Sequence, residues 1–317
     1  MGAVKAFITK TPVPVCGLAL ALVSLDVFLT QQYEFYTFSV CELISAVLLT
    51  LFTLRALLDF SGLRAELSSP VSYGVLPTYC MALMLHSTYA YKYIGQTAVV
   101  IWAVGVILSF VIMFFFAKKF VLNFEMKNVF PSWFVMFIGF VVASVTSPTF
   151  GMEAVGKVLL FAGLTSYVVV TPLILYRIIR IKGIPEPAVP NIAIFAAPMN
   201  LCMVGYFATF GAEVSDAAIA VMAAVGTVSY AAVLLYMPFM LRIKFYPSYA
   251  AFTFPLVIST VSFHYLEAFY GVSEGSIISV VSAITVIIAI LMVAYVFIRY
   301  LIMFYGNADK LRKGTKA

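Results

Sequence analysis

Charged residues are scarce in this chain of 317 residues, because Asp, Glu, Lys and Arg make up only 10% of it. A typical soluble domain contains about 25%. Apolar residues account for 64% of the sequence, and the mean hydropathy is +1.08. Since so much apolar surface has to face a solvent other than water, the composition predicts a protein of the lipid bilayer. It excludes a disordered binding module and a soluble enzyme with a membrane tether.

Motifs of catalysis and metal binding are also missing from the sequence. There is no GxSxG, HExxH or P-loop pattern, and no pair of aspartates lies in the middle of an apolar run. The four cysteines form no CxxC pair and lie in apolar stretches, which is typical of packing residues. They are Cys16, Cys41, Cys80 and Cys202. We therefore expect no enzymatic activity, no catalytic residue, no metal and no cofactor.

Uncharged runs predict ten membrane-spanning helices. Eight runs without Asp, Glu, Lys or Arg each have at least about 19 residues, which is enough to cross a hydrocarbon core of about 30 Å. They are Val71–Tyr91, Tyr93–Ala117, Asn128–Met152, Val158–Tyr176, Pro187–Ala212, Ala217–Leu241, Phe245–Leu266 and Gly275–Ile298. Two weaker candidates precede them: Thr11–Leu25, extended to Thr30 across Asp26, and Leu43–Leu54.

The basic residues predict the orientation of these helices. Of the 19 Lys and Arg residues, only Lys92 and Lys157 fall in the connections on one side. The other 17 fall on the opposite side: Lys5, Lys10, Arg55, Arg64, Lys118, Lys119, Lys127, Arg177, Arg180, Lys182, Arg242, Lys244, Arg299, Lys310, Arg312, Lys313 and Lys316. By the positive-inside rule, both termini are expected in the cytoplasm of a multi-pass protein of the plasma (inner) membrane.

This distribution also predicts the organisation of the chain and its partners. Residues 1–10 are expected to form a short cytoplasmic N-terminus, residues 11–305 the transmembrane domain, and residues 306–317 a basic cytoplasmic tail. The net charge of +6 is then a property of the cytoplasmic loops. We expect the lipid bilayer as a partner and no nucleic acid.

Proline recurs along the chain at a nearly constant interval. Pro12, Pro70, Pro131, Pro190 and Pro247 are separated by 58, 61, 59 and 57 residues, and each begins an odd-numbered span. One interval holds two spans and two connections. The chain is therefore predicted to consist of five helical hairpins.

A proline in a membrane helix frees a backbone carbonyl, which needs burial or a wet cavity in lipid. The five proline-initiated helices are therefore expected to be kinked and to form an inner ring around a pore, with the other five against lipid. Nearby prolines and glycines are expected to kink or line this pore: Pro14, Gly17, Pro77, Gly139, Pro198 and Pro255. The alternative is that these membrane helices merely tolerate proline.

Short motifs near these prolines resemble those of a known family. The stretch Leu63-Arg64-Ala65-Glu66, followed by Ser69-Pro70-Val71, resembles the connection between the second and third helices of the tellurite-resistance/dicarboxylate transporter (TehA-like) family. Phe130-Pro131-Ser132, Ala197-Pro198 and Ala251-Phe252-Thr253-Phe254-Pro255-Leu256 resemble the starts of its fifth, seventh and ninth helices. The same pattern is similar to the plant guard-cell slow anion channels. The resemblance covers nearly the whole chain after residue 10.

The resemblance implies an all-α membrane fold of ten helices in a quasi-fivefold arrangement. It also implies a homotrimer with one pore per subunit, which conducts small anions such as chloride and nitrate. Relatives are named for tellurite resistance or for malate and sulfite transport. The alternative function is therefore a secondary transporter of C4-dicarboxylates or oxyanions.

A phenylalanine of the ninth helix closes the pore in this family, and its place before Pro255 assigns that role to Phe254. TehA-like members have Gly where this chain has Pro255, as the plant channels do. Thr253 is a polar neighbour expected at the pore. A bulky apolar ring can close a constriction by steric exclusion and dewetting without any charge. The alternative is that Phe254 is one of 29 phenylalanines with an ordinary core or lipid-facing position.

Two histidines and several charged residues are further candidates. His86 and His264 lie 16 and 17 residues after their repeat prolines, which predicts positions near the outer mouth. There they could respond to pH, or simply bond water or backbone at the interface. Five ionisable residues near span ends are expected to anchor helices or to pair, as Arg55 with Asp59: Asp26, Glu42, Arg55, Asp59 and Glu267.

No charge is expected at mid-depth in an inner helix. Proton-coupled or ion-coupled transporters generally need such a group, so its absence favours a channel. The transporter alternative also predicts a basic residue in the pathway, and the sequence pattern reveals none there.

Overall fold

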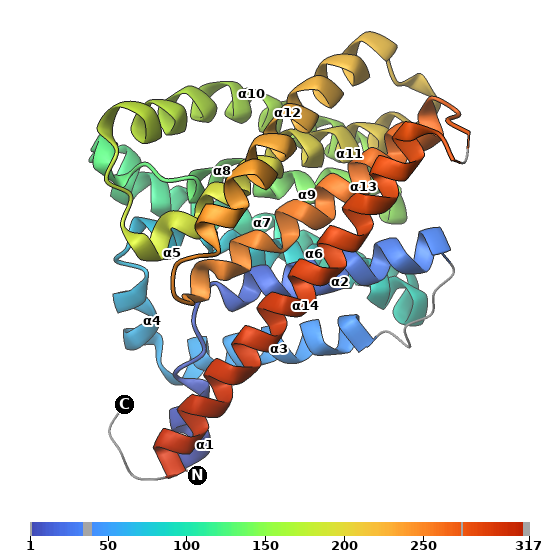
Figure 1. Ribbon diagram of the computed structural model, residues 1–317. Coiled ribbons are helices and arrows are strands. Elements are labelled where there is room, and N and C mark those ends of the chain that lie inside the picture. Colours follow the sequence, from blue (N-terminus) through green and yellow to red (C-terminus); the bar gives the residue numbers. More distant parts are fainter. Residues whose placement is uncertain (1, 34–39, 274, 313–317) are drawn as a thin grey trace.

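The computed structural model describes residues 2–33, 40–273 and 275–312, and every regular element in these ranges is a helix (Figure 1). The charged residues Glu34, Glu274, Lys313 and Lys316 lie outside the described residues. The α-helices are α1 (Gly2–Ile8), α2 (Val15–Tyr33), α3 (Val40–Leu58), α4 (Phe60–Glu66), α5 (Pro70–Val75), α6 (Pro77–Ile94), α7 (Val99–Phe116), α8 (Ser132–Ile138), α9 (Val142–Thr146), α10 (Glu153–Tyr176), α11 (Pro198–Phe210), α12 (Asp216–Met240), α13 (Phe254–Phe269) and α14 (Ile277–Arg312). The expected all-α class is confirmed.

Shorter 3-10 and π-helical segments connect these helices. The 3-10 segments are η1 (Gly95–Ala98), η3 (Met126–Asn128), η4 (Gly139–Val141), η5 (Ser147–Phe150), η7 (Glu186–Ala196), η8 (Gly211–Glu213) and η9 (Pro247–Phe252). The π-helical turns η2 (Ala117–Val121) and η6 (Arg177–Ile181) extend α7 and α10. At the chain ends, the Phe7 ring of α1 lies 5.7 Å from the Phe304 ring of α14. The helix α14 continues into the expected tail.

Nine segments of the described residues are long and apolar enough to cross a membrane. One of them, Pro70–Val121, has 52 residues and contains two separate long helices, α6 and α7. They are joined at Gly95, whose φ of +57° favours glycine, and they pack against each other. A Cβ on Gly105 of α7 would lie only 3.1 Å from the Cys80 carbonyl oxygen of α6. The chain therefore reverses here, as the expected pattern of helical hairpins requires.

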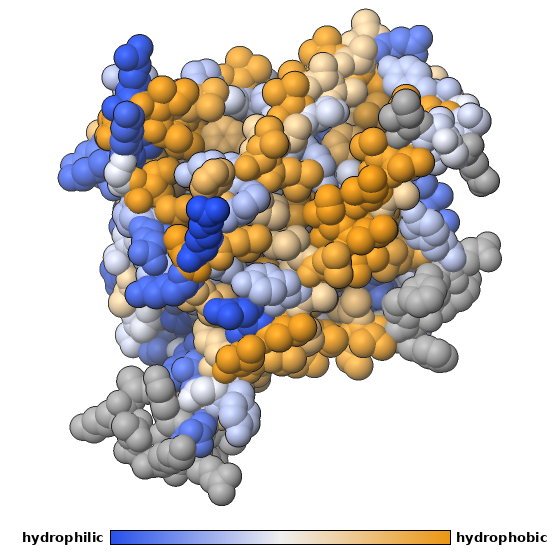
Figure 2. Space-filling view, viewed as in Figure 1, coloured by the Kyte–Doolittle hydropathy of each residue, from blue (hydrophilic) through white to orange (hydrophobic). Residues whose placement is uncertain are grey.

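The proline-initiated segments lie inside the bundle, and the alternating helices lie at its surface. In α2 and in the segments Ser132–Phe150, Glu186–Glu213 and Pro247–Phe269, 72% of the most apolar stretch is buried. The share is 28% to 33% in α3, α12 and the segments Glu153–Ile181 and Ile278–Asp309. Figure 2 shows the resulting apolar surface over α14. Such a surface suits contact with lipid.

The buried segments contact one another in a closed cycle. The helix α2 packs on α6, and α5 and α6 pack on α8 and α9. The cycle continues from α9 to α11 and from α11 to α13, and α13 packs back on α2. Each segment of the cycle comes from a different proline repeat. The quasi-fivefold symmetry itself stays a prediction.

Prolines begin helices in this fold, whereas the sequence pattern suggested kinks within longer helices. Pro77 is the first residue of α6 and Pro198 the first residue of α11, while Pro255 is the second residue of α13. A proline fits these positions because the first N–H groups of a helix have no partner within the helix. In the third repeat the helix is interrupted at Gly139 instead, where α8 ends and the 3-10 segment η4 begins.

Hydrogen bonds of Asn200 join an outer helix to two inner ones. The Asn200 Nδ2 of α11 donates to the Gly226 carbonyl of α12 at 3.3 Å, and Ser262 Oγ of α13 donates to Asn200 Oδ1 at 2.7 Å. A Cβ at Gly226 would lie 2.5 Å from Asn200 Oδ1. A larger residue at 226 would therefore displace the Asn200 amide, and such close contact at a glycine is typical of helix packing in membranes.

The ion pair of Arg55 differs from the expectation. Arg55 is buried and pairs with Glu66 of α4, with 2.5 Å between Nη1 and Oε2, rather than with Asp59. Glu66 Oε1 also accepts a hydrogen bond from the Val13 backbone N–H at 3.0 Å. Asp59 instead caps α4, because it accepts a hydrogen bond from the Gly62 N–H at 3.0 Å. The short helix α4 therefore brings Glu66, and not Asp59, to Arg55.

Asp26 also differs from the expectation of a position at a span end. The helix α2 continues to Tyr33, so Asp26 lies seven residues before its end, and it is fully buried. The Tyr89 hydroxyl of α6 donates a hydrogen bond to Asp26 Oδ2. An inner helix therefore does carry an ionisable group within its length.

We predict that the connections after α7 and after α13 lie on opposite sides of the membrane. Asn123 and Ser273 are exposed in these connections. With Cys41 replaced by Ser, a membrane-impermeant thiol reagent should label Ser273→Cys in intact cells and should label Asn123→Cys only after permeabilisation. Labelling of Asn123→Cys in intact cells would contradict the charge-based orientation.

Candidate functional site

Three cavities follow one another along the axis of the inner helices. Two are named here after a lining residue and one after its position. They are the Arg177 cavity of about 580 Å³, the central chamber of about 50 Å³, and the His264 cavity of about 260 Å³. The first repeat gives their order, since Pro12 lines the first, Gly17 the second and Gln31 the third. Gly17 and Gln31 are about 21 Å apart along a helix.

All five proline repeats contribute to the central chamber. Its lining residues are Pro14, Gly17, Val75, Thr78, Met81, Phe134, Val135, Ile138, Gly139, Asn191, Ile194, Ala197, Pro198, Leu201, Ser248, Ala250, Ala251, Phe254 and Pro255. This set contains no Asp, Glu, Lys, Arg or His. The chamber is therefore a narrow, neutral and mostly apolar constriction between two wider cavities.

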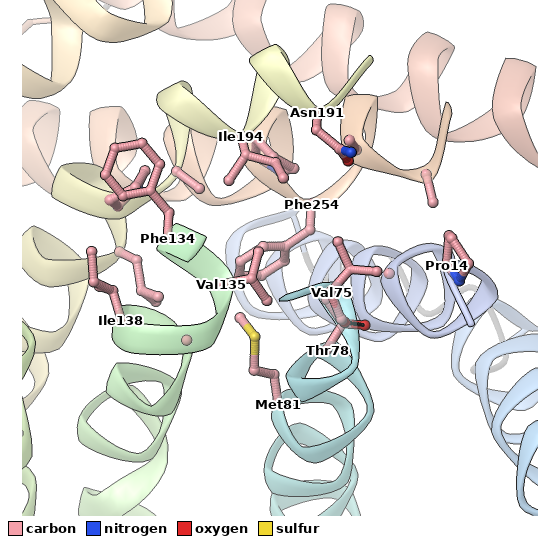
Figure 3. A pocket seen from close by; sticks show the side chains of 18 of the residues that line it. Pro14, Val75, Thr78, Met81, Phe134, Val135, Ile138, Asn191, Ile194 and Phe254 are labelled. Carbon is pink, nitrogen blue, oxygen red and sulfur yellow. Dashed lines mark hydrogen bonds between the residues drawn. The ribbon is translucent and has the colours of Figure 1, made fainter. Parts of the chain in front are cut away.

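Phe254 lies at the boundary between the central chamber and the His264 cavity, because it lines both of them. It is the first residue of α13, and its side chain is 6% exposed. In Figure 3 it occupies the middle of the labelled side chains, with Phe134 and Ile138 on one side and Val75 and Pro14 on the other. Its ring thus stands at the junction of the smallest of the three cavities and the His264 cavity.

Thr253 fixes the turn that precedes Phe254. Its hydroxyl donates to the Ala250 carbonyl at 2.6 Å and approaches the Gly17 carbonyl of α2 at 3.4 Å. Thr253 itself does not line the chamber. Its side chain therefore serves the backbone of the turn rather than the cavity surface.

The neighbouring Phe252 lies in a different environment. It is fully buried, lines none of the three cavities, and its ring makes an edge contact with Tyr249 at 5.1 Å. Only one of the two phenylalanines thus faces the axis.

The remaining predicted pore residues divide into two groups. Five of them line the central chamber: Pro14, Gly17, Gly139, Pro198 and Pro255. Pro77 does not, although its neighbour Thr78 does. Pro77 begins α6 and is buried within the bundle.

The two histidines occupy different surroundings. His264 lines the cavity named after it, 3.5 Å from Glu267 Oε2 and with its ring 5.6 Å from the Phe28 ring. His86 lines none of the three cavities and instead faces α3. Its Nδ1 is 3.2 Å from Glu42 Oε1, and its Nε2 is 2.9 Å from Ser45 Oγ. His264 therefore lines one of the three cavities and His86 does not, while a position at an outer mouth and any response to pH stay predictions.

The Arg177 cavity contains charged residues that the sequence pattern did not place in the pathway. Arg177, Lys127 and Glu66 line it together with uncharged residues. Arg177 was expected to be a loop charge because it follows an apolar run. The sequence gives no signal of its position, because the π-helical turn that continues α10 through Arg177 is seen only in the structure. The sequence pattern therefore did not predict the basic residues of this cavity.

The described side chains offer little for catalysis or metal binding. No group of three or more His, Cys, Asp or Glu side chains among the described residues could hold a metal ion.

Residues 12–301 match the voltage-dependent anion channel family. The chain belongs to this family. The match includes all five proline repeats and all lining residues of the three cavities, and it confirms the expected family. Membership supports an anion channel or transporter rather than an enzyme. No curated protein matches the chain.

Proposed function

We propose that this protein is a channel for small monovalent anions such as chloride and nitrate. Anions would pass along the Arg177 cavity, the central chamber and the His264 cavity. The observation that carries the proposal is the position of Phe254, which borders two cavities on one axis. Its ring would close the path, and its displacement would open it.

The chemistry of the central chamber supports passage rather than tight binding. Its polar side chains are the neutral groups of Thr78, Asn191 and Ser248. Weak contacts with such groups and with backbone dipoles let an ion enter and leave quickly. A volume of about 50 Å³ has room for only a few water molecules, which supports a closed state of the proposed pore. The structure therefore suits a closed channel.

The proposed pore is an inner ring of five proline-initiated segments with quasi-fivefold symmetry. The repeat of prolines and the closed cycle of contacts from α2 to α13 support it. We also propose the cytoplasmic orientation of both termini in a plasma (inner) membrane, which is supported by the distribution of basic residues. Residues 11–305 would then form the transmembrane channel domain.

A secondary transporter of C4-dicarboxylates or oxyanions is the second candidate. The position of Arg177 in a cavity favours it, since a carrier needs a specific binding group for its anion. A coupled carrier also needs a group that responds to the coupling ion. Asp26 is buried in α2, but it lines none of the three cavities and bonds to Tyr89. The channel therefore remains the better-supported proposal.

We expect a homotrimer of the 34.8-kDa chain. The family resemblance supports this assembly, while the apolar outer helices could face either lipid or another subunit. Native mass spectrometry from lipid nanodiscs should give the mass of three chains. A single chain in both nanodiscs and mild detergent would contradict the trimer.

Purified protein in planar bilayers should carry anion current. With a nitrate or chloride gradient, the current should reverse at the Nernst potential of that anion. Flux that saturates and depends on a second ion, with no steady current, would support the transporter instead.

We predict that Phe254→Ala raises anion conductance at least tenfold in the same bilayers. Tenfold corresponds to lowering the barrier by about 1.4 kcal/mol. Phe254→Leu should give a smaller increase, because Leu still fills part of the constriction. The trimer should stay folded. The Phe254 ring borders two cavities, so its truncation removes fewer packing contacts than truncation of a fully enclosed ring would.

Phe252→Ala is the matched control for this prediction. Phe252 is fully enclosed, so its truncation should lower stability by about 3–5 kcal/mol and leave conductance low. If Phe252→Ala raised the conductance and Phe254→Ala did not, the assignment of the gate to Phe254 would be wrong. Silence of both variants would argue against an aromatic gate in α13.

A further inference from the structure

Arg177 is a buried cation on the wall of the widest cavity. It is the first residue of η6, at the end of α10, and it is 4% exposed. Its guanidinium carbon lies 5.5 Å from the centroid of the Phe130 ring, and Phe130 lines the same cavity. Its Nη1 donates to the Lys182 carbonyl. The guanidinium is therefore held in place by a ring and one backbone carbonyl.

Arg177 has no counter-ion within the part of the chain that the structure describes. The ion pairs of these residues include none with Arg177, and its Nε has no hydrogen-bond partner. Glu66 lines the cavity but is paired with Arg55 at 2.5 Å. A buried charge without a partner is strongly unfavourable. An anion in the cavity would remove this cost.

Asn191 supplies a second unused donor between this cavity and the central chamber. It lines both, is 1% exposed, and its Nδ2 has no hydrogen-bond partner. In Figure 3 its side chain lies across the labelled group from Met81. Buried donors are nearly always satisfied by protein, water or a bound ion. Asn191 therefore lies where an anion would move from the wide cavity into the constriction.

The other charges of the cavity do not replace Arg177. Lys127 is 72% exposed and pairs with Glu125 at 3.0 Å. The negative charge of Glu66 is balanced by Arg55. Once these two ion pairs are set aside, the unpaired charge that lines the cavity is the positive charge of Arg177.

We propose that the Arg177 cavity is a binding site for small planar oxyanions, with Arg177 and Asn191 as its donors. The proposal rests on the anion conduction proposed above, and it adds a loading site before the central chamber. Since Nη1 is occupied, Nε and Nη2 remain on one edge of the guanidinium. Such an edge matches two oxygens of nitrate or a monocarboxylate better than it matches spherical chloride.

Equilibrium binding tests this site without any ion flow. Purified protein in nanodiscs is heated in increasing sodium nitrate or sodium chloride, with ionic strength held constant by sodium isethionate. Nitrate should raise the unfolding temperature of the unaltered protein in a saturable way, and at lower concentration than chloride. No saturable effect of nitrate, or an equal effect of chloride at equal concentration, would overturn the proposal.

The variants separate the site from the general positive charge of this end of the molecule. Arg177→Gln should weaken nitrate binding at least tenfold, because it removes the charged donors. Arg180→Gln is the matched control: it makes the same change of charge in the same π-helical turn, but Arg180 is exposed and lines none of the cavities. It should leave the apparent Kd within about twofold. Equal weakening by both variants would show a diffuse electrostatic effect and overturn the site.

Asn191 keeps the test decisive if Arg177→Gln does not fold. Asn191→Ala should weaken nitrate binding by about threefold or more, the loss of one hydrogen bond. Asn191→Asp should abolish nitrate binding, because its carboxylate would repel the anion. Unchanged nitrate binding in both variants would exclude Asn191 and overturn the proposal.

The two proposals can fail separately. If nitrate binds as predicted but bilayers show no steady current, the binding site stands and the channel does not. If anion current is present and Arg177→Gln folds without a change in nitrate affinity, the channel stands and the site does not.

Discussion

A helix that is interrupted within the bilayer leaves backbone N–H and C=O groups without helical partners, and such groups cannot be exposed to hydrocarbon. This constraint explains why the prolines of the five repeats lie on the inner segments and why five of the pore candidates line one chamber. The outer helices carry the apolar surface that faces lipid, and Gly105 and Gly226 let α7 and α12 approach the inner helices closely. The narrow axis and the lipid-facing surface are thus two results of one requirement.

Charge is distributed along the axis in a way that suits both attraction and release of anions. The central chamber has only neutral side chains, while Arg177 lies in the wide cavity before it. A positive charge in a wide space raises the local anion concentration without fixing an ion in the constriction. Inside the constriction the same charge would hold the anion and slow its release. For the attraction and release of anions, the position of a basic residue along the axis therefore matters more than the number of basic residues.

The sequence predicts the helices of this fold well and the partners of single side chains poorly. Proline spacing and uncharged runs identified the hairpins, because lipid imposes length and hydropathy on each span. The choice of Phe254 over Phe252 followed from the resemblance and its place before Pro255, and the structure adds that only Phe254 lines the cavities. The partner of Arg55 depends on how α4 folds back, and His86 faces α3 because of contacts with Glu42 and Ser45. Such contacts depend on how each helix is rotated about its own axis relative to its neighbours, and the spacing of prolines and apolar residues along the sequence does not reveal that rotation.

The approach of Thr253 to the Gly17 carbonyl connects residues separated by 236 positions in the chain. A ribosome releases α2 long before α13, so the turn that carries Phe254 meets its partner only after the last repeat has been synthesised. Until then α2 and α11 each lack the neighbour that α13 provides. Premature termination before α13 would therefore leave the cycle of inner segments open and without Phe254. The order of synthesis thus makes closure of this cycle of contacts and placement of Phe254 the same late event in biogenesis.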